Sequence, residues 1–132
     1  MSSPESNFSA WLRKAEHDLL NIENNLVAKE IPWDTVCFHA QQAAEKLLKA
    51  FPVYHGRDLS KTHDLVALLA KCVECDAGLT DLESDCRKLT TYGVAARYPD
   101  DLFEPDEADG RDVVAAAYRI RTKILSLLPK HL

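Results

Sequence analysis

Apolar side chains recur every three or four positions along most of the chain, which is the period of an amphipathic helix. The first such stretch covers residues 8–29 and the second about 33–51. Ile31-Pro32 separates them, and Pro32 suits a first helical turn because its missing N–H needs no partner there. The two stripes comprise Phe8, Trp11, Leu12, Ala15, Leu19, Ile22 and Leu26, then Val36, Ala40, Ala43, Ala44, Leu47 and Phe51.

A third helix follows the loop that Pro52 and Gly56 predict. We expect it to begin near Ser60 or Thr62, both good N-cap residues, and to end at Gly78. Its inner face comprises Leu65, Leu68, Leu69 and Val73.

The stretch TDLE at 80–83 predicts a capping box between Thr80 and Glu83 at the start of a fourth helix, which Pro99 ends. A fifth helix follows the acidic loop DDLFEPDEADG. The inner residues are Leu82, Cys86, Leu89 and Tyr92 in the fourth helix, and Val113, Ala116, Ala117, Ile120, Ile124 and Leu127 in the fifth.

These elements predict an all-α fold, an up-and-down bundle of four to five antiparallel helices. The length suits a single domain over 1–132 with its core at about 8–128. A net charge of −5 disfavours DNA as a partner, and no apolar run is long enough for a membrane span. The start MSSPESNFSAWLRK lacks the pattern of a secretory signal, so we expect a cytoplasmic protein.

Enzyme signatures such as a glycine-rich phosphate loop or an HExxH zinc site are absent from the sequence. Cys72-x-x-Cys75, with Cys86 and His63, nominally supplies four zinc ligands. The two cysteines lie on a predicted helix without a second close ligand pair, so core packing is the favoured interpretation. We expect neither a metal nor a cofactor.

Polar residues form a second stripe on the helix over 33–51: His39, Gln42, Lys46 and Lys49, bordered by Glu45. The simple interpretation is a solvated face, and the alternative is a surface for a partner or ligand. The stretch KTHDL, residues 61–65, begins the third helix. Thr62 and Asp64 are explained by capping, whereas His63 in the first turn, where backbone N–H groups favour anions, is not.

The stretch VAARYPD places Arg97 and Tyr98 at the break before Pro99. Arg97 either complements the C-terminal dipole of the fourth helix or presents a planar cation to a phosphate, and Tyr98 either packs on the bundle or joins that site.

Three stretches in this order, FHAQQAAEKLLKA (38–50), KTHDL (61–65) and ARYPD (96–100), resemble HEPN domains over roughly Trp11 to Leu128. HEPN abbreviates higher eukaryotes and prokaryotes nucleotide-binding. The resemblance implies a helical bundle that forms a homodimer, in a prokaryote, often beside a minimal nucleotidyltransferase in a toxin–antitoxin module. It also implies that catalytic relatives are metal-independent ribonucleases, in which an arginine, a short spacer and a histidine meet across the dimer.

The sequence departs from that ribonuclease pattern after Arg97. No histidine follows until His131, and RYPDDLFEPDEADG carries six acidic side chains that repel RNA. Arg57 and His63 show the right spacing but precede the third helix, and Arg97 could instead act with His63 or His39.

We therefore expect a component that binds a nucleotide or a nucleotidyltransferase and leans away from catalysis. The candidate binding residues are Arg97, Tyr98, Lys61, His63, Asp64, His39, Gln42 and Lys46. One alternative is a ribonuclease toxin that uses Arg97 with a displaced histidine such as His63. The other is a non-catalytic dimeric scaffold.

Overall fold

Five α-helices and one 3-10 helix make up the computed structural model, which describes residues 4–59, 61–95 and 105–129. The elements are α1 Pro4–Leu26, α2 Trp33–Tyr54, α3 Leu65–Cys75, the 3-10 helix η1 Ala77–Leu82, α4 Glu83–Ala95 and α5 Glu107–Ser126. The predicted all-α bundle is confirmed. None of the described helices combines the length and the apolar character that a membrane-spanning segment requires.

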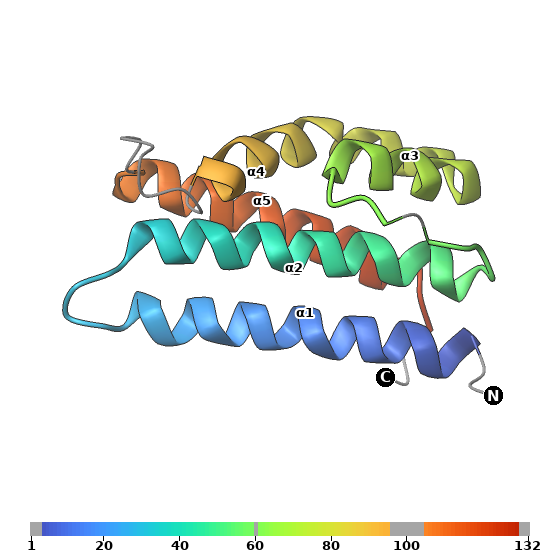
Figure 1. Cartoon of the computed structure of the whole chain (residues 1–132), viewed down its shortest axis with the longest axis horizontal. Helices are drawn as coiled ribbons and strands as arrows, with labels where there is room; N and C mark the ends of the chain where they lie inside the picture. The colour runs from blue at the N-terminus through green and yellow to red at the C-terminus, as the bar shows by residue number, and fades with distance from the viewer. Residues whose placement is uncertain (1–3, 60, 96–104, 130–132) are drawn as a thin grey trace.

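Helix α2 is the centre of the bundle because it packs against α1, α3, α4 and α5. It forms an antiparallel hairpin with α1, and α5 lies behind it (Figure 1). The chain after α2 doubles back over that helix before α3 begins, so the α2–α3 loop lies along α2 rather than beyond its end (Figure 1). This return brings the KTHDL segment to the middle of α2.

The core contains nearly all of the predicted inner residues, because the apolar stripes of the helices face one another. Phe8, Phe51, Leu65, Leu89 and Ile120 are among its largest fully buried side chains. Val73 and Leu127, which were expected on inner faces, are only half-buried at the edge of the core. The inward position of Tyr92 and the break at Pro99 lie outside the residues whose side chains or structure are described.

Several predicted helix boundaries are wrong because side-chain caps decide them. Helix α3 begins after Asp64, whose carboxylate accepts hydrogen bonds from the amides of Val66 and Ala67, so Thr62 does not cap it. Ser60 lies outside the described residues. The helix ends at Cys75, three residues before Gly78.

The prediction of a capping box between Thr80 and Glu83 is also wrong. The Thr80 hydroxyl donates to the Ala77 carbonyl within η1, and α4 begins at Glu83 itself. The first helix ends at Leu26 rather than at residue 29, before the turn that leads to Pro32.

Helix α2 passes Pro52 and ends at Tyr54, although the proline was expected to end it. Pro52 has no N–H to donate to the carbonyl of Leu48, four residues earlier. The Cys72 thiol of α3 donates to that carbonyl instead, with Sγ and O 3.2 Å apart. The acceptor is therefore satisfied from a neighbouring helix, which offsets one cost of a proline inside α2.

Trp33, at the start of α2, packs against Gly110 in the first turn of α5. A Cβ atom built on Gly110 would lie 2.2 Å from the Trp33 ring, so only glycine lets the two helices approach this closely. The Arg111 guanidinium lies 5.3 Å from the centroid of the Trp33 ring and covers it from the solvent side. The start of α5 is set by Asp106, whose side chain accepts a hydrogen bond from the Asp109 amide, and the contact with Trp33 joins that first turn to α2.

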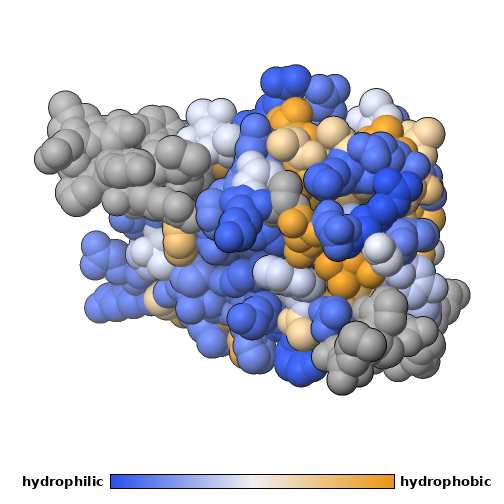
Figure 2. Space-filling model, turned by 45° about the vertical axis from the view of Figure 1, so that its right-hand side comes forward, coloured by the Kyte–Doolittle hydropathy of each residue, from blue (hydrophilic) through white to orange (hydrophobic). Residues whose placement is uncertain are grey.

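The surface is mostly polar, as Figure 2 shows for the end of the molecule that carries the α2–α3 loop. Apolar residues gather in one patch on the upper right of that view. Among the described residues, the most exposed large apolar side chains are those of Leu20 on α1 and of Val27, which directly follows that helix. The homodimer expected from the resemblance stays a prediction.

Gly110→Ala should destabilise the folded protein by about 1–3 kcal/mol, the usual cost of overpacking a tight contact. The measurement is the free energy of unfolding from urea denaturation. In a Trp33→Leu background the clash is relieved, and the same change should become neutral or stabilising because alanine favours the helix by about 1 kcal/mol. The same sign in both backgrounds would contradict the packing argument.

Stability should fall as pH rises above 9. Burial raises the pKa of the Cys37, Cys72 and Cys86 thiols from 9.0 to about 12. Between these values the unfolded chain has lost thiol protons that the folded protein keeps, so its stability is full below pH 9 and is lost as pH approaches 12. Each thiol contributes a slope of up to about 1.4 kcal/mol per pH unit. Urea denaturation from pH 8 to 11 should show a shallower slope for Cys86→Ala than for the wild type, and identical slopes would contradict the prediction.

Candidate functional site on helix α2

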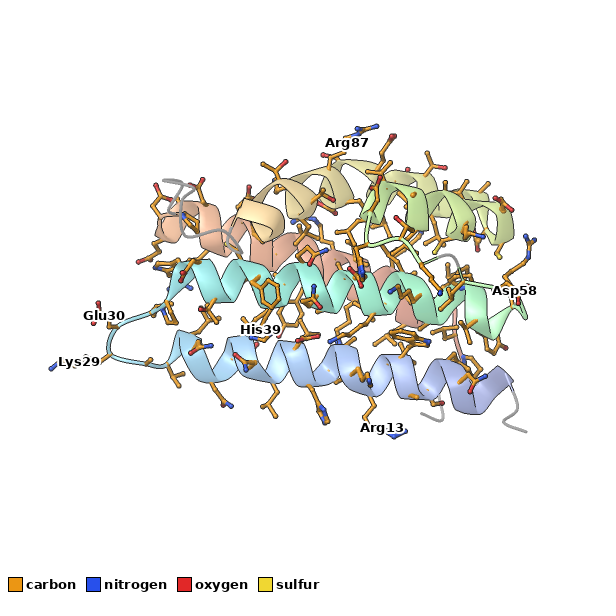
Figure 3. The ribbon with its side chains drawn as sticks, viewed as in Figure 1. Arg13, Lys29, Glu30, His39, Asp58 and Arg87 are labelled. Carbon is orange, nitrogen blue, oxygen red and sulfur yellow. The ribbon has the colours of Figure 1, made fainter. Side chains whose placement is uncertain are left out.

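The polar side chains His39, Gln42, Glu45, Lys46 and Lys49 form a continuous strip along one side of α2, here called the α2 polar strip. The simple interpretation of this strip as a solvent-exposed face of the helix is wrong. Glu45 and Lys49 are buried and the other three are half-buried, because α1 and the α2–α3 loop cover them. Figure 3 shows His39 between α1 and α2.

At one end of the strip, Asp18 of α1 binds two of its residues. Its Oδ1 lies 2.9 Å from the His39 Nδ1, and its Oδ2 accepts a hydrogen bond from the Lys46 ammonium. Asp18 is only 8% exposed, so its charge needs these partners. Sequence reasoning missed Asp18, although its spacing from Ala15 and Ile22 places it on the inner face of the first helix.

Glu45 is the second centre of the strip and is 4% exposed. Its Oε2 accepts from the Lys49 ammonium at 3.1 Å and lies 3.0 Å from the His63 Nδ1. Its Oε1 lies 3.4 Å from the Gln41 amide nitrogen, and Gln42 donates to Gln41 at 2.8 Å. A buried carboxylate thus joins α2 to the KTHDL loop.

Trp11 of α1 extends this cluster, because the Lys49 ammonium lies 5.2 Å from the centroid of its ring. Lys49 therefore contacts a carboxylate and an aromatic face at once, both strong partners for a desolvated cation. The same contact fixes the orientation of the indole against α2.

Lys61, His63 and Asp64 are the exposed residues of the KTHDL loop. The Thr62 hydroxyl accepts from the Asp64 amide, and one Asp64 oxygen caps α3, so both residues have a local structural role. Lys61 is exposed and has no ion-pair partner among the described residues. A binding role for Asp64 stays a prediction.

His63 combines a buried anchor with an exposed ring, since its side chain is 69% exposed. An ionised carboxylate only accepts hydrogen bonds, so the Nδ1 that faces Glu45 carries the proton. The Nε2 is then the free position of the ring, able to accept a hydrogen bond or, in the protonated ring, to donate one. A carboxylate that orients a histidine in this way is typical of functional sites.

The two carboxylate–histidine pairs do not form one catalytic centre. His39 and Glu45 are six residues apart on α2, which corresponds to about 9 Å along the helix axis. His39 is held from α1, whereas His63 approaches from the α2–α3 loop. An acid and a base that act on one phosphate must both be within hydrogen-bond reach of it, so these histidines have separate roles.

Arg57 and His63, which have the ribonuclease spacing, bind different partners. The Arg57 guanidinium lies 3.1 Å from Glu74 of α3, and His63 is held by Glu45. Arg97, Tyr98 and His131 lie outside the described residues, so their roles, alone or with His63 or His39, stay predictions.

The nominal zinc ligands do not gather around one point. His63 binds Glu45, and Cys72 donates to a backbone carbonyl in the core. In the part of the chain that the structure describes, no three histidine, cysteine or carboxylate side chains form a group able to hold a metal ion. The packing interpretation accounts for Cys37, Cys72 and Cys86, which are buried, while Cys75 is half-buried.

Comparison with known proteins agrees with this fold. The family model described as HEPN domain matches residues 8–127, and the helical bundle is consistent with that family. The chain therefore belongs to the HEPN domain family. It is also similar to TT1696 from Thermus thermophilus, whose crystal structure aligns with a TM-score of 0.79 and 26% identity over 92% of this chain and 98% of that one. The comparison with curated proteins finds no match.

Glu45→Gln should destabilise the protein by on the order of 3 kcal/mol, because it leaves the Lys49 charge buried without its partner. Urea denaturation measures the loss. Adding Lys49→Met, which removes the unpaired charge, should recover part of it. The matched control is Glu83→Gln, which removes an exposed carboxylate paired with Arg87 at the same four-residue spacing and should cost less than about 1 kcal/mol. Equal losses from the two glutamates would contradict the central role of Glu45.

Proposed function

We propose that this HEPN chain is the binding component of a prokaryotic module of toxin–antitoxin type, and that its KTHDL loop contacts a nucleotide or a nucleotidyltransferase partner. The observation that carries the proposal is His63: a ring anchored on a buried carboxylate that leaves its Nε2 at the surface. An anchored ring loses little conformational freedom on binding, which favours recognition.

The distribution of positive charge supports this loop as the contact. Lys46 and Lys49 are already paired with the carboxylates of Asp18 and Glu45, so neither is free for a phosphate without leaving a buried anion unpaired. Lys61 is exposed and lies two residues before His63 in the sequence, and it can bind a phosphate without leaving a buried carboxylate unpaired. Together they offer a compact pair of donors to phosphate oxygens. In the proposal Arg97 and Tyr98 of the ARYPD motif complete the site.

A ribonuclease is the second candidate, and the same histidine favours it. A carboxylate–imidazole pair with a free Nε2 is able to take the proton of a 2′-OH group. The arginine that would stabilise the phosphorane is Arg97 in this hypothesis, as the resemblance of the ARYPD stretch to HEPN domains implies. The acidic stretch after Arg97 opposes an extended RNA backbone, which ranks binding above cleavage.

His63→Gln and Lys61→Ala should each weaken ATP binding about tenfold or more, because each removes a charge-assisted hydrogen bond worth about 1.5–3 kcal/mol. Isothermal titration with ATP is the measurement. Co-purification with the product of a neighbouring nucleotidyltransferase gene should weaken in the same variants. Arg87→Ala on α4 removes one exposed cation on the far side of the bundle from α1 (Figure 3) and is the matched control.

Unchanged ATP binding and unchanged co-purification in both variants would overturn the proposed contact. Metal-free cleavage of mixed cellular RNA by the wild type, lost in His63→Gln and in Arg97→Ala, would instead establish the ribonuclease. The folded state of each variant is checked by its thermal unfolding. Lys61→Ala should change it little because Lys61 is exposed, whereas His63→Gln removes a partner of the buried Glu45, so its ATP binding is measured at a temperature where the variant is folded.

A further inference from the structure

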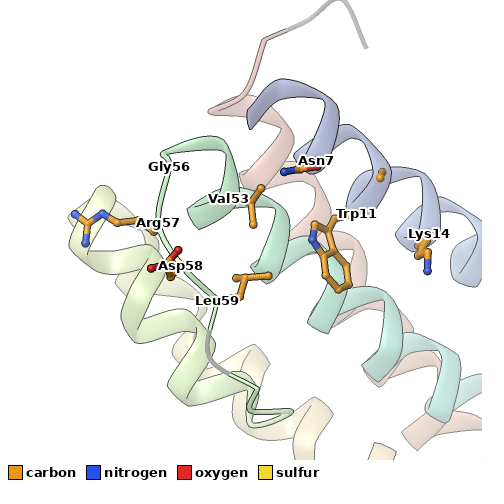
Figure 4. A pocket seen from close by; sticks show the side chains of 9 residues that line it. Asn7, Trp11, Lys14, Val53, Gly56, Arg57, Asp58 and Leu59 are labelled. Carbon is orange, nitrogen blue, oxygen red and sulfur yellow. The ribbon is translucent and has the colours of Figure 1, made fainter. Parts of the chain in front are cut away.

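A hollow of about 590 Å³ opens between the first half of α1 and the start of the α2–α3 loop. Its volume falls within the range of small-molecule sites. Trp11 and Lys14 line it from α1, Val53 from the last turn of α2, and Arg57 to Leu59 from the loop (Figure 4). It lies at the end of the α2 polar strip, to which Trp11 connects it.

Trp11 gives the hollow a flat aromatic wall. The contact between its ring and Lys49 ties the indole to the buried Glu45 pair, so it is held in place before any ligand arrives. Leu59 and Val53 stand across the hollow from it (Figure 4). A planar ring that enters this space would stack on the indole and contact aliphatic carbon on its other side, a pairing that stabilises a bound nucleic-acid base whatever its identity.

Positive charge lies at the rim of the hollow. Lys14 is exposed and has no ion-pair partner among the described residues. Arg57 points away from the hollow toward α3 (Figure 4), where it pairs with Glu74. The two side chains of that pair are 48% and 61% exposed, so solvent weakens the pair and a phosphate can compete for the guanidinium. Lys14, Arg57 and Asp58 together give the rim a net charge of +1, whereas the whole chain has a net charge of −5.

We propose that this hollow binds a mononucleotide, with the base stacked on Trp11 and the phosphates between Lys14 and Arg57. This inference rests on the proposed function, from which it takes the nucleotide as the class of ligand. It places the base in a site separate from the contact at Lys61 and His63. An aromatic wall with two mobile cations favours a small planar anion over a peptide or a lipid surface. Glu74 limits the affinity because it competes with the phosphate for Arg57.

Trp11 supplies its own reporter, because the chain has only two tryptophans and Trp33→Phe leaves one. Titration of this variant with ATP should give a saturable change in fluorescence. Adenosine should bind at least tenfold more weakly because it lacks the phosphates. Inorganic triphosphate should leave the fluorescence unchanged and compete with ATP. Should Trp33→Phe not fold, the indole N–H resonance of Trp11 in the wild type, assigned with Trp11→Phe, reports the same contact.

Three substitutions separate binding from structure. Lys14→Ala and Arg57→Ala should each weaken ATP about tenfold, whereas Arg13→Ala, the neighbouring cation on α1 (Figure 3), should have no effect. Glu74→Gln should strengthen ATP binding about two- to fivefold by freeing Arg57, a gain that a purely structural role would not give.

An unchanged Trp11 signal at millimolar ATP, or equal affinities in wild type, Lys14→Ala and Arg57→Ala, overturns the inference. The same measurements test the proposed function independently. If His63→Gln loses ATP binding and the Trp11 signal does not change with ATP, the loop contact is retained and the hollow is rejected. If the Trp11 signal responds to ATP equally in the wild type, His63→Gln and Lys61→Ala, the hollow is retained and the loop contact is rejected.

Discussion

A carboxylate buried in the middle of a helix must be paired, and the arrangement around Glu45 satisfies that requirement. An isolated charge in an apolar interior is costly by many kcal/mol, so Glu45 is stable only with Lys49 on its own helix and His63 from the returning loop. One partner is local, and the other is 18 residues away in sequence. The second contact holds the α2–α3 loop along α2, and that course of the loop exposes the ring of His63 and shapes the space beside Trp11.

The return of the loop also depends on how α2 ends. Pro52 does not break the helix, because Cys72 donates to the carbonyl that the proline leaves unpaired. The helix therefore continues to Tyr54, and the loop begins beyond it, over the first half of α1. A shorter α2 would start the loop nearer Glu45. The site thus follows from two satisfied polar groups, a carboxylate and a carbonyl, rather than from the apolar core alone.

The helices were predictable because burial imposes a period on apolar residues, and Phe8, Leu47 and Ile120 are buried as that period requires. The boundaries were less predictable because several residues compete for each cap: Asp64 outcompetes Thr62 through two backbone amides. The α2 polar strip was visible as a pattern, but a period cannot say whether a neighbouring helix covers it. Its partner Asp18 has core spacing but polar character, so a search for apolar stripes passes over it.

The pairing of charges also bears on what kind of ligand this HEPN chain suits. The two lysines of α2 are paired with carboxylates inside the bundle, and the sequence after Arg97 is acidic. Both features disfavour an extended nucleic-acid backbone as the ligand. The described cations without an ion pair are scattered: Arg13 and Lys14 lie on the first half of α1 and Lys61 on the α2–α3 loop, and the others are Lys29, Lys71 and Lys123. Such a distribution matches a compact anion, whose charge is concentrated in a few oxygens, because a few well-placed donors can then satisfy it. The proposed selectivity for a small ligand or a single protein surface would therefore follow from the same burial that stabilises the fold.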